Sequence, residues 1–122
     1  MDIKQESLLS AYEYIEKLHE GIKRAILYGK DNRIDELRLL TAEIIDGLNW
    51  FSDVITLTQD IYVESINMDT FKASLDEIYL SLKNEDYILL IDTYEYELLG
   101  LLEDWYNKIQ ITLNYLHEKG EQ

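Results

Sequence analysis

Apolar residues recur at intervals of three and four along most of the chain, which is the spacing of one face of an α-helix. The first set is Leu8, Tyr12, Ile15, His19, Ile22 and Ile26. It predicts a helix over about residues 4–28, with Gly29 in the position favoured for a left-handed C-terminal cap. We expect Asp31 or Asn32 to cap a second helix, which could run to about Gln59. The apolar positions of this second helix are Ile34, Leu37, Thr41, Ile44, Leu48, Phe51 and Ile55.

The segment Ile61–Met68 breaks this regular spacing, because β-branched and polar residues alternate irregularly within it. It predicts a connector that crosses one end of the molecule. A short third helix is expected from about Asn67 or Asp69 to Lys83–Asn84. Its apolar positions are Phe71, Leu75, Ile78 and Leu82.

The fourth predicted helix, Glu85–Leu116, carries two adjacent apolar stripes. The first stripe is Tyr87, Ile91, Tyr94, Leu98, Leu101 and Trp105, and the second is Ile88, Leu99, Leu102, Tyr106, Ile109 and Leu113. Such a wide apolar face fits a helix that packs between two neighbours in a bundle. It also fits a helix that offers one stripe to another chain. The second reading makes a candidate partner surface of Ile88, Leu99, Leu102, Tyr106 and Ile109.

These elements predict an all-α fold in a single domain, residues 1–122. The expected architecture is a four-helix up-down-up-down bundle whose third helix is short. The chain contains no proline and five glycines, which agrees with a fold poor in turns. The core is predicted to contain Leu8, Ile15, Ile22, Ile26, Leu37, Ile44, Leu48, Phe51, Phe71, Leu75, Ile78, Leu98, Leu101 and Trp105.

The charge of the chain narrows the range of partners. It has 11 basic and 25 acidic residues, a formal net charge of −14. An acidic chain repels both nucleic-acid backbones and anionic membrane surfaces, so we expect neither as a partner. A basic protein is the partner that this charge favours. No run of apolar residues is long enough to span a bilayer and no secretory signal begins the chain, so a cytoplasmic location is expected.

Motifs that would support catalysis are missing or incomplete. Bundles with two metal ions need Glu-x-x-His motifs on two helices, and this chain has one, Glu16–His19. The other histidine, His117, has Asn114 in the position of the required glutamate. Neither a Gly-x-Ser-x-Gly turn nor a glycine-rich phosphate loop is present, and the chain contains no cysteine. We therefore expect no catalytic residues, no metal ligands and no cofactor.

The run from Asp86 to Leu99, DYILLIDTYEYELL, followed by Trp105, is similar to a run in small bacterial helical-bundle proteins without an assigned activity. The tetrapeptide Gly47–Trp50 resembles an earlier part of the same pattern. The resemblance implies a helical bundle, and it supplies neither an activity nor functional residues.

The chain has ten tyrosines and two phenylalanines. Because tyrosine combines an apolar ring with a hydroxyl that stays hydrated, this excess suggests partly buried surfaces of the kind found at protein interfaces. The leading hypothesis is a non-catalytic protein-interaction module, either an adaptor, a chaperone-like protein or a regulatory bundle. It would act through an apolar-aromatic face rimmed by acids. The expected partner is a basic or helical protein, with a homodimer as a further possibility. The alternative is a bundle that binds a metal or small ligand, or an enzyme, built on inward-facing carboxylates with His19.

Overall fold

The computed structural model describes residues 2–120, and all of its regular structure over that range is helical. The elements are α1 (Ile3–Lys30), α2 (Ile34–Leu57), η1 (Gln59–Ile61), α3 (Asp69–Lys83), α4 (Tyr87–Thr93), η2 (Tyr94–Leu98) and α5 (Leu99–Gly120). The last three follow one another without a break and correspond to the single fourth helix expected from the sequence. The all-α prediction is confirmed.

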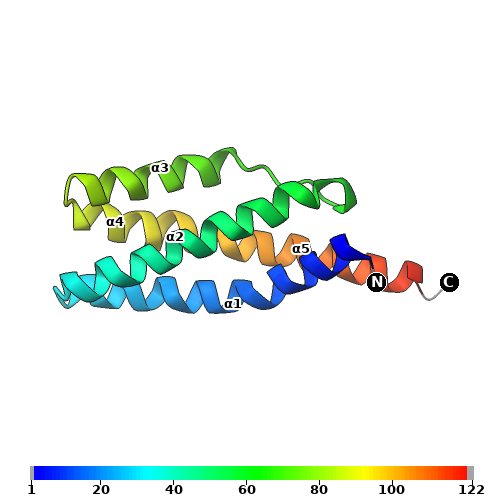
Figure 1. Ribbon diagram of the computed structural model, residues 1–122, viewed down its shortest axis with the longest axis horizontal. Coiled ribbons are helices and arrows are strands. Elements are labelled where there is room, and N and C mark those ends of the chain that lie inside the picture. The colour runs from blue at the N-terminus through cyan, green and yellow to red at the C-terminus, as the bar shows by residue number, and fades with distance from the viewer. Residues whose placement is uncertain (1, 121–122) are drawn as a thin grey trace.

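The molecule is elongated along its helices (Figure 1). The turns 31–33 and 84–86 lie at one end, and the connector after α2 lies at the other end with both termini. Helix α1 packs against α2 and α5, and α3 packs against α4. Across residues 2–120, no helix combines the length and the apolar character needed to cross a membrane.

The two turns between helices share one hydrogen-bonding pattern. In the first turn, Asn32 N–H donates to Gly29 O and Arg33 N–H donates to Tyr28 O. In the second turn, Glu85 N–H donates to Leu82 O and Asp86 N–H donates to Ser81 O. This is the Schellman arrangement, which needs a left-handed residue just past the helix. Asn32, with φ 58°, and Glu85, with φ 54°, take that position.

The prediction that Gly29 forms a left-handed cap is therefore wrong. Gly29 lies inside α1, which ends at Lys30, and Asn32 supplies the positive φ. A Cβ atom at Gly29 would overlap the side chain of Ile91, so the glycine is needed for the close approach of α1 and α4. The prediction that Asp31 or Asn32 caps α2 is also wrong, because Arg33 occupies the N-cap and its side chain makes no capping bond.

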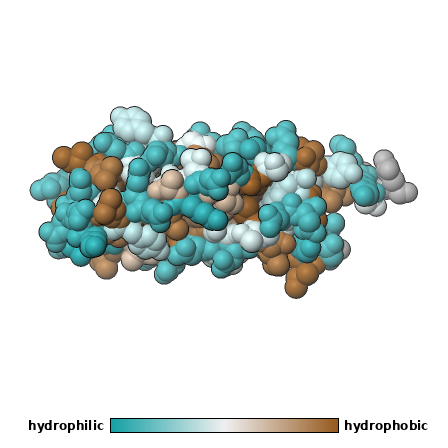
Figure 2. Space-filling model, turned by 90° about the horizontal axis from the view of Figure 1, so that it is seen from above, coloured by the Kyte–Doolittle hydropathy of each residue, from teal (hydrophilic) through white to brown (hydrophobic). Residues whose placement is uncertain are grey.

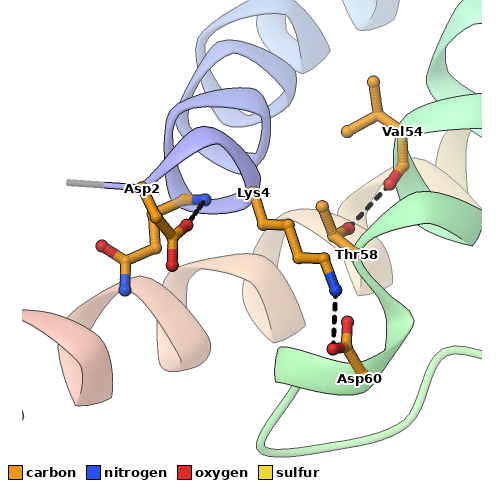
Figure 3. Close-up of polar contacts among 6 residues, drawn as sticks. Asp2, Lys4, Val54, Thr58 and Asp60 are labelled. Carbon is orange, nitrogen blue, oxygen red and sulfur yellow. Dashed lines mark hydrogen bonds and ion pairs between the residues drawn. The ribbon is translucent and has the colours of Figure 1, made fainter.

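The connector between α2 and α3 is tied to the rest of the molecule by side chains (Figure 3). Lys4 Nζ lies 2.7 Å from Asp60 Oδ2, which links the start of α1 to η1. The Thr58 hydroxyl donates to the Val54 carbonyl at the end of α2. On the other side, Val63 N–H donates to Thr112 Oγ1 of α5.

The core is a single cluster that contains every predicted core residue except Leu75 and Leu101, which are half-buried against it. Within this cluster Trp105 packs against both Phe51 and Phe71, with ring centroids 5.1 Å from each. The buried polar residues between 2 and 120 are all serines and threonines: Thr41, Thr58, Ser74, Ser81, Thr93 and Thr112.

The fourth helix is α-helical except in η2, which is a π-helix. The Leu99 amide donates to the carbonyl of Tyr94, five residues earlier, which is the π-helical bond. The buried apolar positions from Leu90 to Leu102 are Leu90, Tyr94, Leu98 and Leu102, at strict intervals of four. In a regular α-helix each step of four rotates a side chain about 40° past a full turn, so three steps would carry it off the core face. The wider π-helical turn keeps all four on one face.

Candidate functional site

The structure separates the residues of the predicted partner surface. Ile88 is 76% exposed, Leu99 and Tyr106 are half-buried, and Leu102 and Ile109 are 1% and 0% exposed. Leu102 and Ile109 belong to the core because η2 rotates the second stripe inward beyond Leu98. The five residues therefore do not form one continuous outer face. The face of the molecule seen from above in Figure 2 is mostly hydrophilic, with hydrophobic residues in separate clusters.

A hollow of about 550 Å³ between α1 and α5 brings two of these residues together with the motif that contains His19. Each helix contributes four residues with the same spacing, Ile15, Glu16, His19 and Glu20 from α1, and Leu102, Glu103, Tyr106 and Asn107 from α5. Ile15 and Leu102 are buried and form an apolar floor. The three glutamates and Asn107 are exposed and form the rim.

The rim is strongly acidic and only partly neutralised. His19 Nε2 lies 3.3 Å from Glu103 Oε1, and Lys23 Nζ lies 3.7 Å from Glu20 Oε1. Among residues 2–120, no cationic side chain lies within ion-pair distance of Glu16. The contact between His19 and Glu103 is an ion pair only when the imidazole is protonated. The hollow therefore has an apolar base and an excess of negative charge at its edge.

Tyr106 is held in the hollow by Tyr12. The two rings stack with centroids 4.7 Å apart and planes 19° from parallel, and their hydroxyl oxygens are 2.8 Å apart. The hydrogen bond to Tyr106, followed by burial, raises the pKa of Tyr12 to about 12. The Tyr12 hydroxyl thus stays protonated at neutral pH. Tyr106, stacked on Tyr12, therefore forms an aromatic wall of the hollow.

The described residues do not assemble a metal site in this hollow. Over residues 2–120, no three or more His, Asp or Glu side chains converge in an arrangement that could hold a metal ion. Glu16 and His19 do share the hollow, as their spacing of three suggested, but the chain supplies no second such motif.

A carboxyl pair at η2 was not anticipated from the sequence. Glu77 of α3 and Glu97 of η2 share a hydrogen bond, which is the main reason why the pKa of Glu97 rises to about 7. Thr93 Oγ1 lies 3.2 Å from Glu77 Oε2 and 2.9 Å from the Leu89 carbonyl. Sequence spacing could not find this pair, because the two acids meet across different helices.

A second hollow, of about 450 Å³, lies between α1 and α2. Tyr14 and Trp50 form its walls in an edge-to-face pair with centroids 5.3 Å apart. Neither residue was singled out from the sequence as part of a site, although Trp50 falls in the tetrapeptide noted above.

The fold and these hollows define an all-helical domain with acidic, partly aromatic recesses along its first helix. Residues 6–108 match DUF8042, a domain of unknown function, and the chain belongs to this family. No curated protein and no solved structure matches the chain.

Proposed function

We propose that this chain is a non-catalytic interaction domain that binds a basic segment of a partner protein in the hollow between α1 and α5. The observation that carries the proposal is the combination of an apolar floor, Ile15 and Leu102, with a rim of three glutamates. The four helices act as an up-down-up-down bundle that holds the two lining helices at a constant separation.

Lysine and arginine side chains match a recess of this kind. Their methylene stems pack on apolar surface while the charged heads reach outward to acids. In the hollow, a stem would lie along the Tyr106 ring and its head would meet Glu16 or Glu103. Tyrosine is enriched at interface hot spots because it offers a large rigid contact with few rotatable bonds.

The net charge supports a basic partner over a second copy of the chain. Two copies would each carry a formal charge of −14 and repel one another. A cationic partner would instead be attracted over long range, and its association rate would fall as salt screens the field.

The test is affinity capture of the tagged protein from a lysate of its host, followed by mass spectrometry. The rim variant is Glu16→Arg with Glu103→Arg. The matched control is Glu64→Arg with Asp76→Arg, two exposed acids outside the hollow, which gives the same net charge. The change Leu102→Asp is unsuitable, because it would place a carboxylate in the core and unfold the domain.

We expect a partner that the wild type and the control retain and the rim variant loses, while circular dichroism shows all three folded. Synthetic peptides from that partner should locate the binding segment in a stretch containing lysine or arginine. A partner lost equally from both variants, or a binding segment without basic residues, would refute the proposal.

A further inference from the structure

The hollow between α1 and α2 lies on the other flank of α1. Tyr12 packs on α5, whereas Tyr14, two residues later, packs on α2. The α1/α2 hollow is lined by Tyr14, Glu43, Asp46, Gly47 and Trp50. No residue is shared between the two hollows, so each can be tested alone.

The aromatic walls of this hollow are held rigidly. The planes of Tyr14 and Trp50 meet at 75°, so one ring edge contacts the other ring face. A Cβ atom at Gly47 would collide with the Tyr14 hydroxyl, so the glycine lets the phenol lie directly on the α2 backbone. Trp50 remains 42% exposed, while Trp105 is 1% exposed. A large aromatic surface is therefore presented to solvent in a set orientation.

Two carboxylates border these rings. Glu43 and Asp46 are exposed and three residues apart on α2, which makes them neighbours on one helix face. Within residues 2–120, no lysine, arginine or histidine forms an ion pair with either. Neighbouring like charges on a helix destabilise it, and a cation bound between them would remove that repulsion.

We propose that the hollow formed by Tyr14, Glu43, Asp46 and Trp50 binds the guanidinium group of an arginine side chain from a partner protein. Aromatic faces attract cations, and tryptophan does so most strongly. A guanidinium is planar, so it stacks on an indole and still directs N–H groups in its plane toward carboxylates. A lysine ammonium lacks this planar match. The site does not depend on the α1/α5 hollow.

The test uses the indole N–H signals of the two tryptophans in ¹H–¹⁵N spectra of the full chain. The probe is the tripeptide acetyl-Gly-Arg-Gly-amide, added at constant ionic strength. Matched peptides carry citrulline, the neutral isostere of arginine, or lysine in its place. The Trp50 signal is assigned by its absence from a Trp50→Phe spectrum, and the Trp105 signal serves as the internal control.

We expect the arginine peptide to shift the Trp50 signal saturably and leave the Trp105 signal in place, with little effect from the citrulline peptide. The variant Glu43→Gln with Asp46→Asn should weaken binding about fivefold, as expected for two exposed charge interactions. The charge-matched variant Glu64→Gln with Asp76→Asn should bind like the wild type, as should the rim variant of the α1/α5 hollow.

Equal shifts from the citrulline and arginine peptides, or the absence of a saturable shift, would overturn the proposal. Equal affinity for the lysine peptide would overturn its guanidinium specificity. If affinity fell equally in both charge-neutralised variants, the binding would reflect overall charge and the assignment of this site would be wrong.

Discussion

Trp105 stacks on Phe51 with ring centroids 5.1 Å apart and planes 1° from parallel. Phe51 belongs to α2 and Trp105 to α5, so the stack joins the first half of the chain to the last helix. Phe71 of α3 also packs against the indole, with ring centroids 5.1 Å apart and planes tilted by 51°. Three helices therefore meet at one side chain, which is 1% exposed.

Removal of this indole should destabilise the domain severely. We expect Trp105→Ala to lower the free energy of unfolding by about 3–5 kcal/mol, because it leaves a cavity between three helices. Trp50→Ala is the control, since that ring is partly exposed. It should lower the free energy of unfolding by less than about half of the loss expected for Trp105→Ala. Urea denaturation followed by circular dichroism measures both. Equal losses would contradict the view that the three helices depend on the buried Trp105 ring more than on the exposed Trp50 ring.

Two helical glycines should respond in opposite directions to alanine. Alanine normally stabilises a helix by about 1 kcal/mol relative to glycine, and Gly100 has open space where a Cβ would lie. Gly100→Ala should therefore stabilise the protein. Gly29→Ala should destabilise it by about 1–3 kcal/mol, because the new methyl group overlaps Ile91. In an Ile91→Val background the cost of Gly29→Ala should fall, and an unchanged cost would exclude this contact as its cause.

The left-handed residue of the second turn offers a stabilising change. Glu85 has φ 54°, a conformation that costs an ordinary side chain about 1 kcal/mol and costs glycine nothing. Glu85→Gly should raise the unfolding midpoint. The control is Glu36→Gly in a right-handed helical position of α2, which should lower the midpoint. A destabilised Glu85→Gly variant would be inconsistent with strain at this turn.

The carboxyl pair at η2 should make stability depend on pH. The hydrogen bond to Glu77 raises the pKa of Glu97 from 4.5 to about 7, so the folded state holds a proton that the unfolded state has lost over this interval. Where the folded state binds more protons, stability falls as pH rises. This contribution is complete below pH 4.5 and disappears as pH rises through about 7.

We therefore expect Glu97→Gln to remove this part of the pH dependence and to be more stable than the wild type at pH 8. Asp92→Asn, which removes an exposed acid of α4, is the control. The measurement is the urea midpoint from pH 4 to pH 8. A wild type and a Glu97→Gln variant with parallel profiles would show that the pair does not share a proton.

The helices could be predicted because their apolar residues are regularly spaced. The same assumption of regular spacing led to the wrong assignment of core positions in the last helix. The sequence pattern assigned Tyr94 and Leu98 to one stripe of the last helix and Leu102 to another. The structure places all three in the core. A strictly α-helical projection cannot reproduce this, because η2 adds a residue to one turn. The only sign of the π-helical turn in the sequence is the run of apolar residues at intervals of four, Leu90, Tyr94, Leu98 and Leu102.

The hollows were less accessible to prediction than the helices. Glu16 and His19 were recognisable as a pair on one helix, but their opposite wall comes from α5, more than eighty residues later. The Tyr14–Trp50 pair depends on Gly47, whose small size has meaning only when α1 lies against it. Such sites arise from the packing between helices, which local periodicity does not encode.

Two buried serines of α3 provide a final matched comparison. The Ser81 hydroxyl donates to the Glu77 carbonyl at 2.7 Å, whereas Ser74 Oγ is buried and finds no hydrogen-bond partner among the described residues. A buried hydroxyl without a partner costs free energy, and alanine also favours the helix. Ser74→Ala should therefore stabilise the domain by about 0.5–1 kcal/mol in urea denaturation. Ser81→Ala should give a smaller gain in stability or a loss, because it removes the hydrogen bond from the Ser81 hydroxyl to the Glu77 carbonyl. If the two variants changed stability equally, the unsatisfied hydroxyl would not be the source of the gain.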